Sequence, residues 1–315
     1  MTSEESKITS EIDKERRRIF NKLRKCSWAS CNEMAIDSHV LQKNGFISVI
    51  AEKGQVYEHE FYPFDEKKFR FKKKGVNQVF TFKGFCSHHD DLLFKEIEKK
   101  SIDFNDYKSN LLFAYRILAQ EIVKKSNVIE LYEALINKGI VDFISLCQEI
   151  DGQKMGINDA LFTQQKILEN IENPDLNEFN FHVRKIRFLD ACASGVYTFE
   201  TTKEINEMPP EISCLPLTDI FVNILPVGQD TIVSFVYLKS NNLKCNSYIS
   251  RKWQLPEGKF TKFLSDILLA QMENWIISPT SFERLKKDEE ILANITRIAL
   301  DTDNERFDID YDLFK

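Results

Sequence analysis

CSWASC (26–31) and GFCSHHDD (84–91) are the two stretches of this 315-residue chain that decide how its first hundred residues fold. The first contains Cys26 and Cys31, and the second contains Cys86 and His89. Two cysteines in a tight turn can present both thiolates to one ion, and a Cys-x-x-His pair at the start of a helix adds two ligands from a single turn. Together the four residues predict a closed, tetrahedral Cys₃His site, which is the structural kind of zinc site.

Two alternatives to this ligand set stay open. His88 could take the fourth position in place of His89, although the three-residue step from Cys86 favours His89. The cysteines could also be buried and unligated, since a free cysteine behaves as a small apolar residue. The helix expected after the second pair has an apolar face, and Asp90 and Asp91 in its first turn suit the positive end of the helix dipole.

The pattern of apolar residues changes near residue 100. Helical spacing predicts one helix through Leu111 and Ile122, and a second from Val128 to about residue 148 with an interruption at Gly139. A third is expected from Asn158 to about Ile171. Alternation of apolar residues then predicts an antiparallel sheet over about 179–250, and helical spacing returns over about 259–298. We therefore expect an α+β fold with a zinc module in residues 1–100 and a larger helical and antiparallel-sheet domain in residues 101–315.

Composition indicates a folded cytoplasmic protein. Hydrophobic residues make up 43% of the chain and include 25 Phe, which is enough for a packed core. No apolar run is long enough to cross a membrane, and the polar first twenty residues do not resemble a secretory signal. Seven cysteines, an odd number, without such a signal favour a reducing compartment over a set of disulfides.

The stretch AIDSH (35–39) between the two ligand pairs completes a resemblance. A cysteine pair, a hairpin whose first strand ends in His39, and a helix opened by the second ligand pair resemble the zinc-bearing branch of the HNH, or His-Me finger, endonucleases. That branch has a treble-clef (ββα-metal) fold, and the resemblance covers about residues 20–100. The rest of the chain resembles only uncharacterised bacterial proteins.

The resemblance implies two catalytic residues. His39 would be the general base that deprotonates the attacking water, and Asp90 would bind a catalytic Mg²⁺ or Mn²⁺ against the scissile phosphate. The chain departs from the family at Ser38, where an acidic residue is usual before the catalytic histidine. Two alternatives for His39 therefore stay open, a structural role and a place among the zinc ligands. The nearby His59 could be a further metal ligand or could contact a phosphate, but a structural role is favoured for it.

Charge is unevenly distributed along the chain. Residues 1–100 contain 20 Lys and Arg against 16 Asp and Glu, whereas the remainder contains 23 against 33. Clustered cations are what a phosphate backbone requires. The side chains expected to bind DNA or RNA are Arg16, Arg17, Arg18, Lys22, Arg24, Lys67, Lys68, Arg70, Lys72, Lys73 and Lys74.

Two functions follow from these features. The first is a metal-dependent endonuclease that cleaves phosphodiester bonds, as would suit a bacterial antiviral defence effector. The alternative is a catalytically degenerate zinc finger that only binds nucleic acid or a protein. The acidic second domain suits a protein partner, a homo-oligomer is compatible with either function, and the acidic end of the chain (301–315) is expected to be a solubilising tail.

Overall fold

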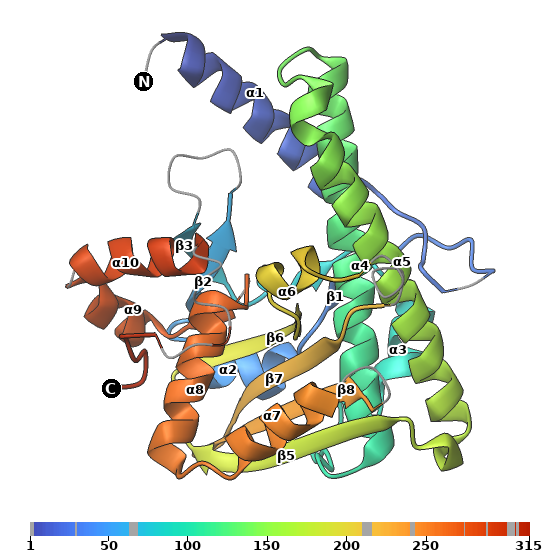
Figure 1. Cartoon of the computed structure of the whole chain (residues 1–315), viewed down its shortest axis with the longest axis vertical. Helices are drawn as coiled ribbons and strands as arrows, with labels where there is room; N and C mark the ends of the chain where they lie inside the picture. Colours follow the sequence, from blue (N-terminus) through green and yellow to red (C-terminus); the bar gives the residue numbers. More distant parts are fainter. Residues whose placement is uncertain are drawn as a thin grey trace.

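A seven-stranded antiparallel sheet with helices on both faces forms the body of the molecule (Figure 1). The computed structural model describes residues 3–28, 30–62, 69–209, 216–239, 243–273, 275–287, 289–300, 306 and 309–315. Sheet and helices are mixed along the chain, and all strand pairs of the large sheet are antiparallel. The α+β prediction is confirmed.

The strands of the large sheet come from both ends of the chain. Their order is β3-β2-β9-β6-β7-β8-β5. Their bounds are β2 Gln55–Phe61, β3 Phe69–Gly75, β5 Phe179–Arg187, β6 Ala191–Thr198, β7 Asp219–Val227, β8 Asp230–Leu238 and β9 Trp275–Ile277. Successive side chains point to opposite faces, so Ile220 and Val222 lie in one core cluster whereas Phe221 lies in the other.

Each face of the sheet is covered by its own set of helices (Figure 1). One core cluster packs the sheet against α7 and α8, and the other packs it against α4 and residues of the first hundred. The helices after residue 100 are α4 Tyr107–Asn137, α5 Phe143–Glu172, η2 Pro174–Leu176, α6 Thr202–Asn206, α7 Leu243–Trp253, α8 Glu257–Ala270, α9 Pro279–Lys286 and α10 Glu289–Leu300.

Two long antiparallel helices replace the three shorter ones expected over residues 104–171. α4 continues through the polar stretch at 124–127, so the predicted break before Val128 is wrong. The polar side chains there have partners distant in the sequence: Lys124 lies 2.6 Å from Glu273, and Asn127 accepts a hydrogen bond from Arg24. The interruption expected at Gly139 is confirmed: α4 ends at Asn137, α5 begins at Phe143, and Gly139 lies between them in the left-handed conformation.

The first hundred residues pack against the rest of the chain. Their elements are α1 Ser3–Phe20, β1 Ser38–His39, η1 Lys43–Ile47, α2 Ser48–Ile50, the hairpin of β2 and β3, β4 Thr81–Phe82 and α3 Ser87–Phe94. β1 pairs with β4, and the hairpin between them joins β9 of the large sheet. Hydrogen bonds and core contacts cross the boundary near residue 100, and the division of the chain into two domains there stays a prediction.

The end of the chain packs against α8. Ile309 is buried and its N–H donates to Asp266, and the N–H of Leu313 donates to Ser265 Oγ. The expectation of a solubilising tail is therefore wrong for residues 309–315, since apolar side chains among the acidic ones anchor it. Within the described residues, no helix has the length and apolar character that crossing a membrane requires.

Candidate metal centre and its neighbours

The segment around Cys26 and Cys31 is a short turn held on both sides by backbone hydrogen bonds. The N–H of Cys26 donates to the carbonyl of Glu33, and that of Cys31 donates to the carbonyl of Trp28. The N–H of Ser27 donates to the carbonyl of Gly84, which fixes the turn beside the segment leading to Cys86. These hydrogen bonds hold the segment so that both thiols belong to the same cluster.

Cys86 and His89 come from the start of α3. Cys86 is the N-cap residue in an extended conformation, and its carbonyl accepts the N–H of Asp90, which closes the first turn. His89 lies one turn on, so both side chains share a face of the helix. The backbone N–H of His89 lowers the pKa of the Cys86 thiol, and the thiols of Cys26 and Cys31 lower it too. Burial raises this pKa, but the net change is downward. A lowered pKa favours the thiolate that binds metals.

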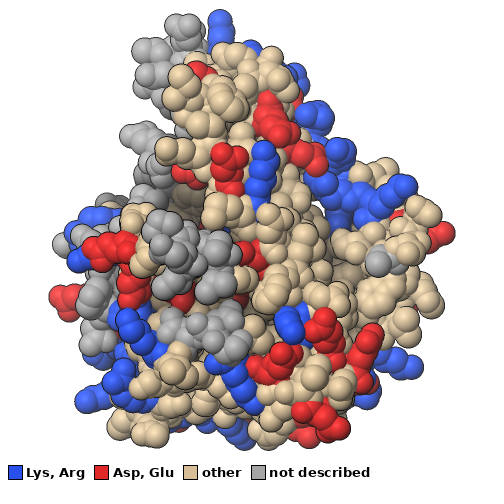
Figure 2. All heavy atoms as spheres, turned by 45° about the vertical axis from the view of Figure 1, so that its right-hand side comes forward, with Lys and Arg blue, Asp and Glu red and all other residues tan. Residues whose placement is uncertain are grey.

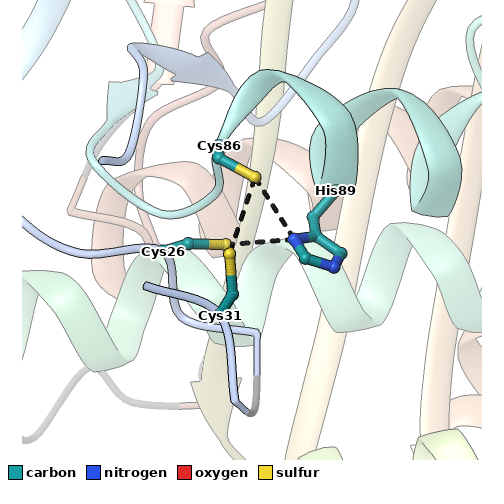
Figure 3. A group of neighbouring side chains, drawn as sticks. All are labelled: Cys26, Cys31, Cys86 and His89. Atoms are coloured by element: carbon teal, nitrogen blue, oxygen red, sulfur yellow. Dashed lines mark hydrogen bonds between the residues drawn. The ribbon is translucent and has the colours of Figure 1, made fainter. Parts of the chain in front are cut away.

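The four side chains converge on one point (Figure 3). Their donor atoms all lie within 4.8 Å of one another, with 3.9 Å between the sulfurs of Cys31 and Cys86. His89 Nδ1 lies 3.2 Å from Cys86 Sγ and 3.5 Å from Cys26 Sγ. A tetrahedral ion with metal–sulfur bonds of about 2.3 Å separates two sulfurs by about 3.8 Å. These four residues could hold a metal ion of that size.

Burial and stacking shield this cluster. Cys26 and Cys86 are buried, and the indole of Trp28 stacks on His89 with ring centroids 5.5 Å apart. His88 is exposed and is not one of the four clustered donors, so of the two histidines considered for the fourth position the structure brings His89 to the thiols. A closed set of four protein donors leaves no place for a substrate, which is typical of a structural site.

His39 lies at the end of β1, opposite Thr81 of β4. β4 leads through Cys86 into α3, so β1, β4 and α3 follow one another in space as two antiparallel strands and a helix. Burial lowers the pKa of His39, and the positive charges of Arg116 and Lys43 lower it further against the opposing effect of Asp90 and Glu98. His39 Nε2 is buried without a hydrogen-bond partner among the described residues. A neutral imidazole is the form that accepts a proton.

Asp90 is paired with a buried arginine. Its Oδ2 lies 3.1 Å from a guanidinium nitrogen of Arg116, which also lies 2.7 Å from Glu98. Arg116 is 1% exposed and its guanidinium covers the ring of Phe94 at 4.2 Å. Asp90 Oδ1 has no hydrogen-bond partner in the part of the chain that the structure describes. One oxygen of this carboxylate is thus occupied, and the other is not.

Arg116 was missed by the sequence analysis, although the sequence contains a signal for it. It is the one charged residue in the apolar run LLFAYRILA (111–119) of α4. A charged residue in the middle of a buried helical face needs a partner of opposite charge. Such a run therefore indicates a buried ion pair, and in the structure the carboxylate of Asp90 is one of its members.

The basic residues expected to bind nucleic acid occupy several different environments. Arg17, Arg18, Lys72 and Lys73 are exposed. Lys22 and Arg24 both pair with Glu130 of α4, and Lys74 pairs with Glu58 at 2.5 Å and with Glu60. Lys67 and Lys68 lie outside the described residues. Figure 2 shows Lys and Arg atoms gathered on one side of the upper part of the molecule and mixed with acidic atoms elsewhere.

Two basic residues are held against one aromatic ring. The guanidinium of Arg16, on α1, lies 4.1 Å from the centroid of Tyr62, and that of Arg70, on β3, lies 3.7 Å from the same centroid. By contrast His59, on the opposite face of β2, is 1% exposed and stacks on Phe69 at 4.8 Å. His59 is therefore a core residue and lies apart from the cysteine cluster.

Comparison with known proteins adds no assignment. No protein-family model, curated protein or solved structure matches the chain.

Proposed function

We propose that the chain is a metal-dependent endonuclease of the HNH type, built on a structural zinc ion. The observation that carries the proposal is the arrangement of β1, β4 and α3, in which the strand that carries His39 pairs with the strand that leads into the helix of Asp90. This is the pairing of base and metal ligand that the resemblance implies, and it connects residues far apart in the sequence. The Cys₃His cluster fixes the start of α3, from which Asp90 projects.

The donor atoms fit the two kinds of ion that such an enzyme uses. Three thiols and an imidazole nitrogen suit zinc. Asp90 Oδ1 is a hard oxygen without a partner among the described residues, as Mg²⁺ or Mn²⁺ prefers. A bound divalent cation would supply charge stabilisation at the phosphate. His39, kept neutral by burial and by nearby cations, would take the proton of the attacking water.

The setting supports the same proposal. Six described cysteines are free, as is usual in the reducing cytoplasm where we place the protein. The exposed Arg17, Lys72 and Lys73 support contacts with the phosphates of DNA or RNA, whereas Arg18 is already paired with Glu15 at 2.8 Å. A protein partner of the acidic second part, and a defence role, are compatible extensions of the proposal.

One observation favours a second candidate function. The ion pair of Asp90 with Arg116 occupies one oxygen of the carboxylate that would hold the catalytic cation. A positive charge at this distance opposes the binding of a second cation. If the pair persists in solution, the module would bind nucleic acid or a protein without cleaving.

Cleavage assays on single variants test the proposal. Wild type, His39→Ala, Asp90→Asn and the matched control His88→Ala would be incubated with plasmid DNA, single-stranded DNA and RNA in Mg²⁺ or Mn²⁺. Zinc content would be measured for each protein. We expect cleavage by wild type and His88→Ala only, with zinc retained in His39→Ala and Asp90→Asn. Cleavage that survives in His39→Ala would overturn the assignment of the base, and binding without any cleavage by wild type would favour the second candidate.

A further inference from the structure

Helix α5 has an exposed apolar face. Five of its large apolar side chains are between 43% and 83% exposed, and these are Phe143, Ile144, Met155, Leu161 and Phe162. Single exposed apolar residues are common on protein surfaces, but a group of them on one element marks a surface that contacts a partner. Figure 1 shows α5 running in front of α4 from the upper end of the molecule to its lower right.

The opposite side of α5 is already used inside the chain. Leu146 and Ile150 are buried in one core cluster with Tyr132 of α4, and Ile167 is buried in another with Leu118. A surface helix of a globular protein usually buries one apolar stripe and has polar residues on its opposite face. α5 departs from this pattern, because its second apolar face is exposed.

The exposed face of α5 has apolar groups towards both ends and a pair of opposite charges midway. Residues 143–144 and 161–162 are 18 positions apart, which is five turns of the helix, so they lie on the same side of it, about 27 Å apart. Asp151 and Lys154 lie between them, with side chains 74% and 56% exposed. Their charged groups are 4.0 Å apart and largely in water, so this pair within the helix is weak.

We infer that α5 packs antiparallel against α5 of a second copy of this chain, around a two-fold axis. The residues that face each other across this axis are Phe143 and Phe162, Ile144 and Leu161, and Asp151 and Lys154, and each pair has its midpoint between residues 152 and 153. A two-fold axis forms every such contact twice, so the ion pairs in the centre are flanked by an apolar group at each end.

Charge selects this arrangement over its alternatives. If the two helices were parallel, Asp151 would face Asp151 of the other copy, and like charges in contact oppose association. If the helices were shifted by one residue, Asp151 would face Met155 or Gln153 instead of Lys154. The antiparallel arrangement about the stated midpoint joins opposite charges and apolar groups at the same time, which fixes both direction and register.

The expected interface is small. One helix from each copy covers an area at the lower end of the roughly 1,200–2,000 Å² that is usual for stable complexes, so we expect a dissociation constant of about 1–100 μM. The surface includes neither His39 nor Asp90 nor any residue of the cysteine cluster. The inference therefore stands apart from the proposed function.

Sedimentation velocity of the full chain over about 1–200 μM tests the inference. Ile144→Asp would be compared with Leu243→Asp, a matched control on α7, because the two native side chains are 83% and 84% exposed. We expect Ile144→Asp to weaken the dimer at least about tenfold, since its carboxylate would be buried against Leu161, and the control to stay within about twofold of wild type. Circular dichroism melts and zinc content would confirm that both variants fold.

Charge reversal tests the central pair. Asp151→Lys alone and Lys154→Asp alone place like charges opposite each other, so each should weaken the dimer at least about tenfold. An equimolar mixture of the two proteins restores opposite charges in the mixed dimer and should associate about as tightly as wild type.

Cross-linking tests the direction of the helices. Asn158 and Cys147 share the same midpoint, so Asn158→Cys should be joined to Cys147 of the other copy by a short bismaleimide, as identified by mass spectrometry. Lys259→Cys, on α8, is the control and should not be joined to Cys147.

Four results would overturn the inference: a wild-type chain that stays monomeric up to about 200 μM, an Ile144→Asp protein that dimerises as tightly as wild type, charge variants that remain monomeric when mixed, and a cross-link between two Cys147 residues. Cleavage by a monomeric chain would reject this inference and leave the proposed function standing. A dimer of the expected properties that does not cleave would do the reverse.

Discussion

The guanidinium of Arg116 lies 3.1 Å from the carboxylate of Asp90, and this buried pair connects α4 to the helix that carries two of the four candidate metal ligands. Removing one partner of a buried pair leaves the other as an uncompensated charge. The pair therefore matters both to the fold and to the availability of Asp90 for a cation.

Arg116→Met should lower the free energy of unfolding by about 3–5 kcal/mol, because Asp90 loses its partner inside the protein. Urea unfolding at pH 7 measures the change. Lys185→Ala is the control, since its pair with Asp230 is largely exposed and should be worth less than about 1 kcal/mol. The double variant Arg116→Met/Asp90→Asn should recover a large part of the lost free energy of unfolding. An Arg116→Met protein as stable as wild type would contradict the role given to the pair.

Metal analysis tests the cysteine cluster. We expect about one zinc ion per chain in wild type, and loss of the ion with a lower melting temperature in Cys86→Ser, because three donors bind zinc far less tightly than four. Cys147→Ser should retain the ion, since this thiol lies on α5 outside the cluster. A full complement of zinc in Cys86→Ser, measured by inductively coupled plasma mass spectrometry, would rule out the proposed ligand set.

The acid limb of the cleavage rate should report on His39. Burial and the charges of Arg116 and Lys43 lower its pKa, so the base should remain neutral, and the enzyme active, to below the ordinary value of 6.5. Lys43→Gln removes one of these cations and should move the acid limb to higher pH. Lys259→Gln, a change of the same charge on α8, should leave the limb in place. Cleavage rates would be measured between pH 5 and pH 8. The same acid limb in all three proteins would show that protonation of His39 does not cause it.

His59 should make stability depend on pH. Burial lowers its pKa from 6.5 to about 4, with Glu273 and Glu60 acting in the opposite direction. The unfolded chain then binds a proton below pH 6.5 that the folded chain does not bind until pH 4, so stability is present above pH 6.5 and is lost as the pH falls towards 4. The loss should reach about 3 kcal/mol over this range.

His59→Phe should remove this part of the pH dependence, because phenylalanine fits among Phe69, Phe71 and Trp275 and carries no proton. Urea unfolding of wild type and variant at several values between pH 7 and pH 4.5 gives the comparison. Parallel curves for the two proteins would show that His59 does not titrate as its burial requires.

The cysteine cluster shows how far local sequence could lead. Cys26 and Cys31 are brought together by a short turn, and Cys86 and His89 by one turn of helix, so each pair is specified by its own spacing. The sequence indicated that the two pairs meet only because both supply ligands for the same kind of metal ion. The alternation of apolar residues in β7 and β8 is a local signal of the same kind, because successive side chains of a strand point to opposite faces of the sheet and enter different core clusters.

The sequence by itself thus determined the four clustered side chains, the α+β class and the strands of the sheet predicted over about 179–250. The end of that sheet was wrong, because β8 ends at Leu238 and α7 begins at Leu243. Only the tertiary structure decided the continuity of α4, where Lys124 and Asn127 are satisfied by Glu273 and Arg24, and the joining of β2 to β9. It also decided the pairing of Asp90 with Arg116. The physical reason is the same in each case: a polar or charged group in an apolar setting is stabilised by a partner far away in the sequence, and spacing along the chain does not encode that partner.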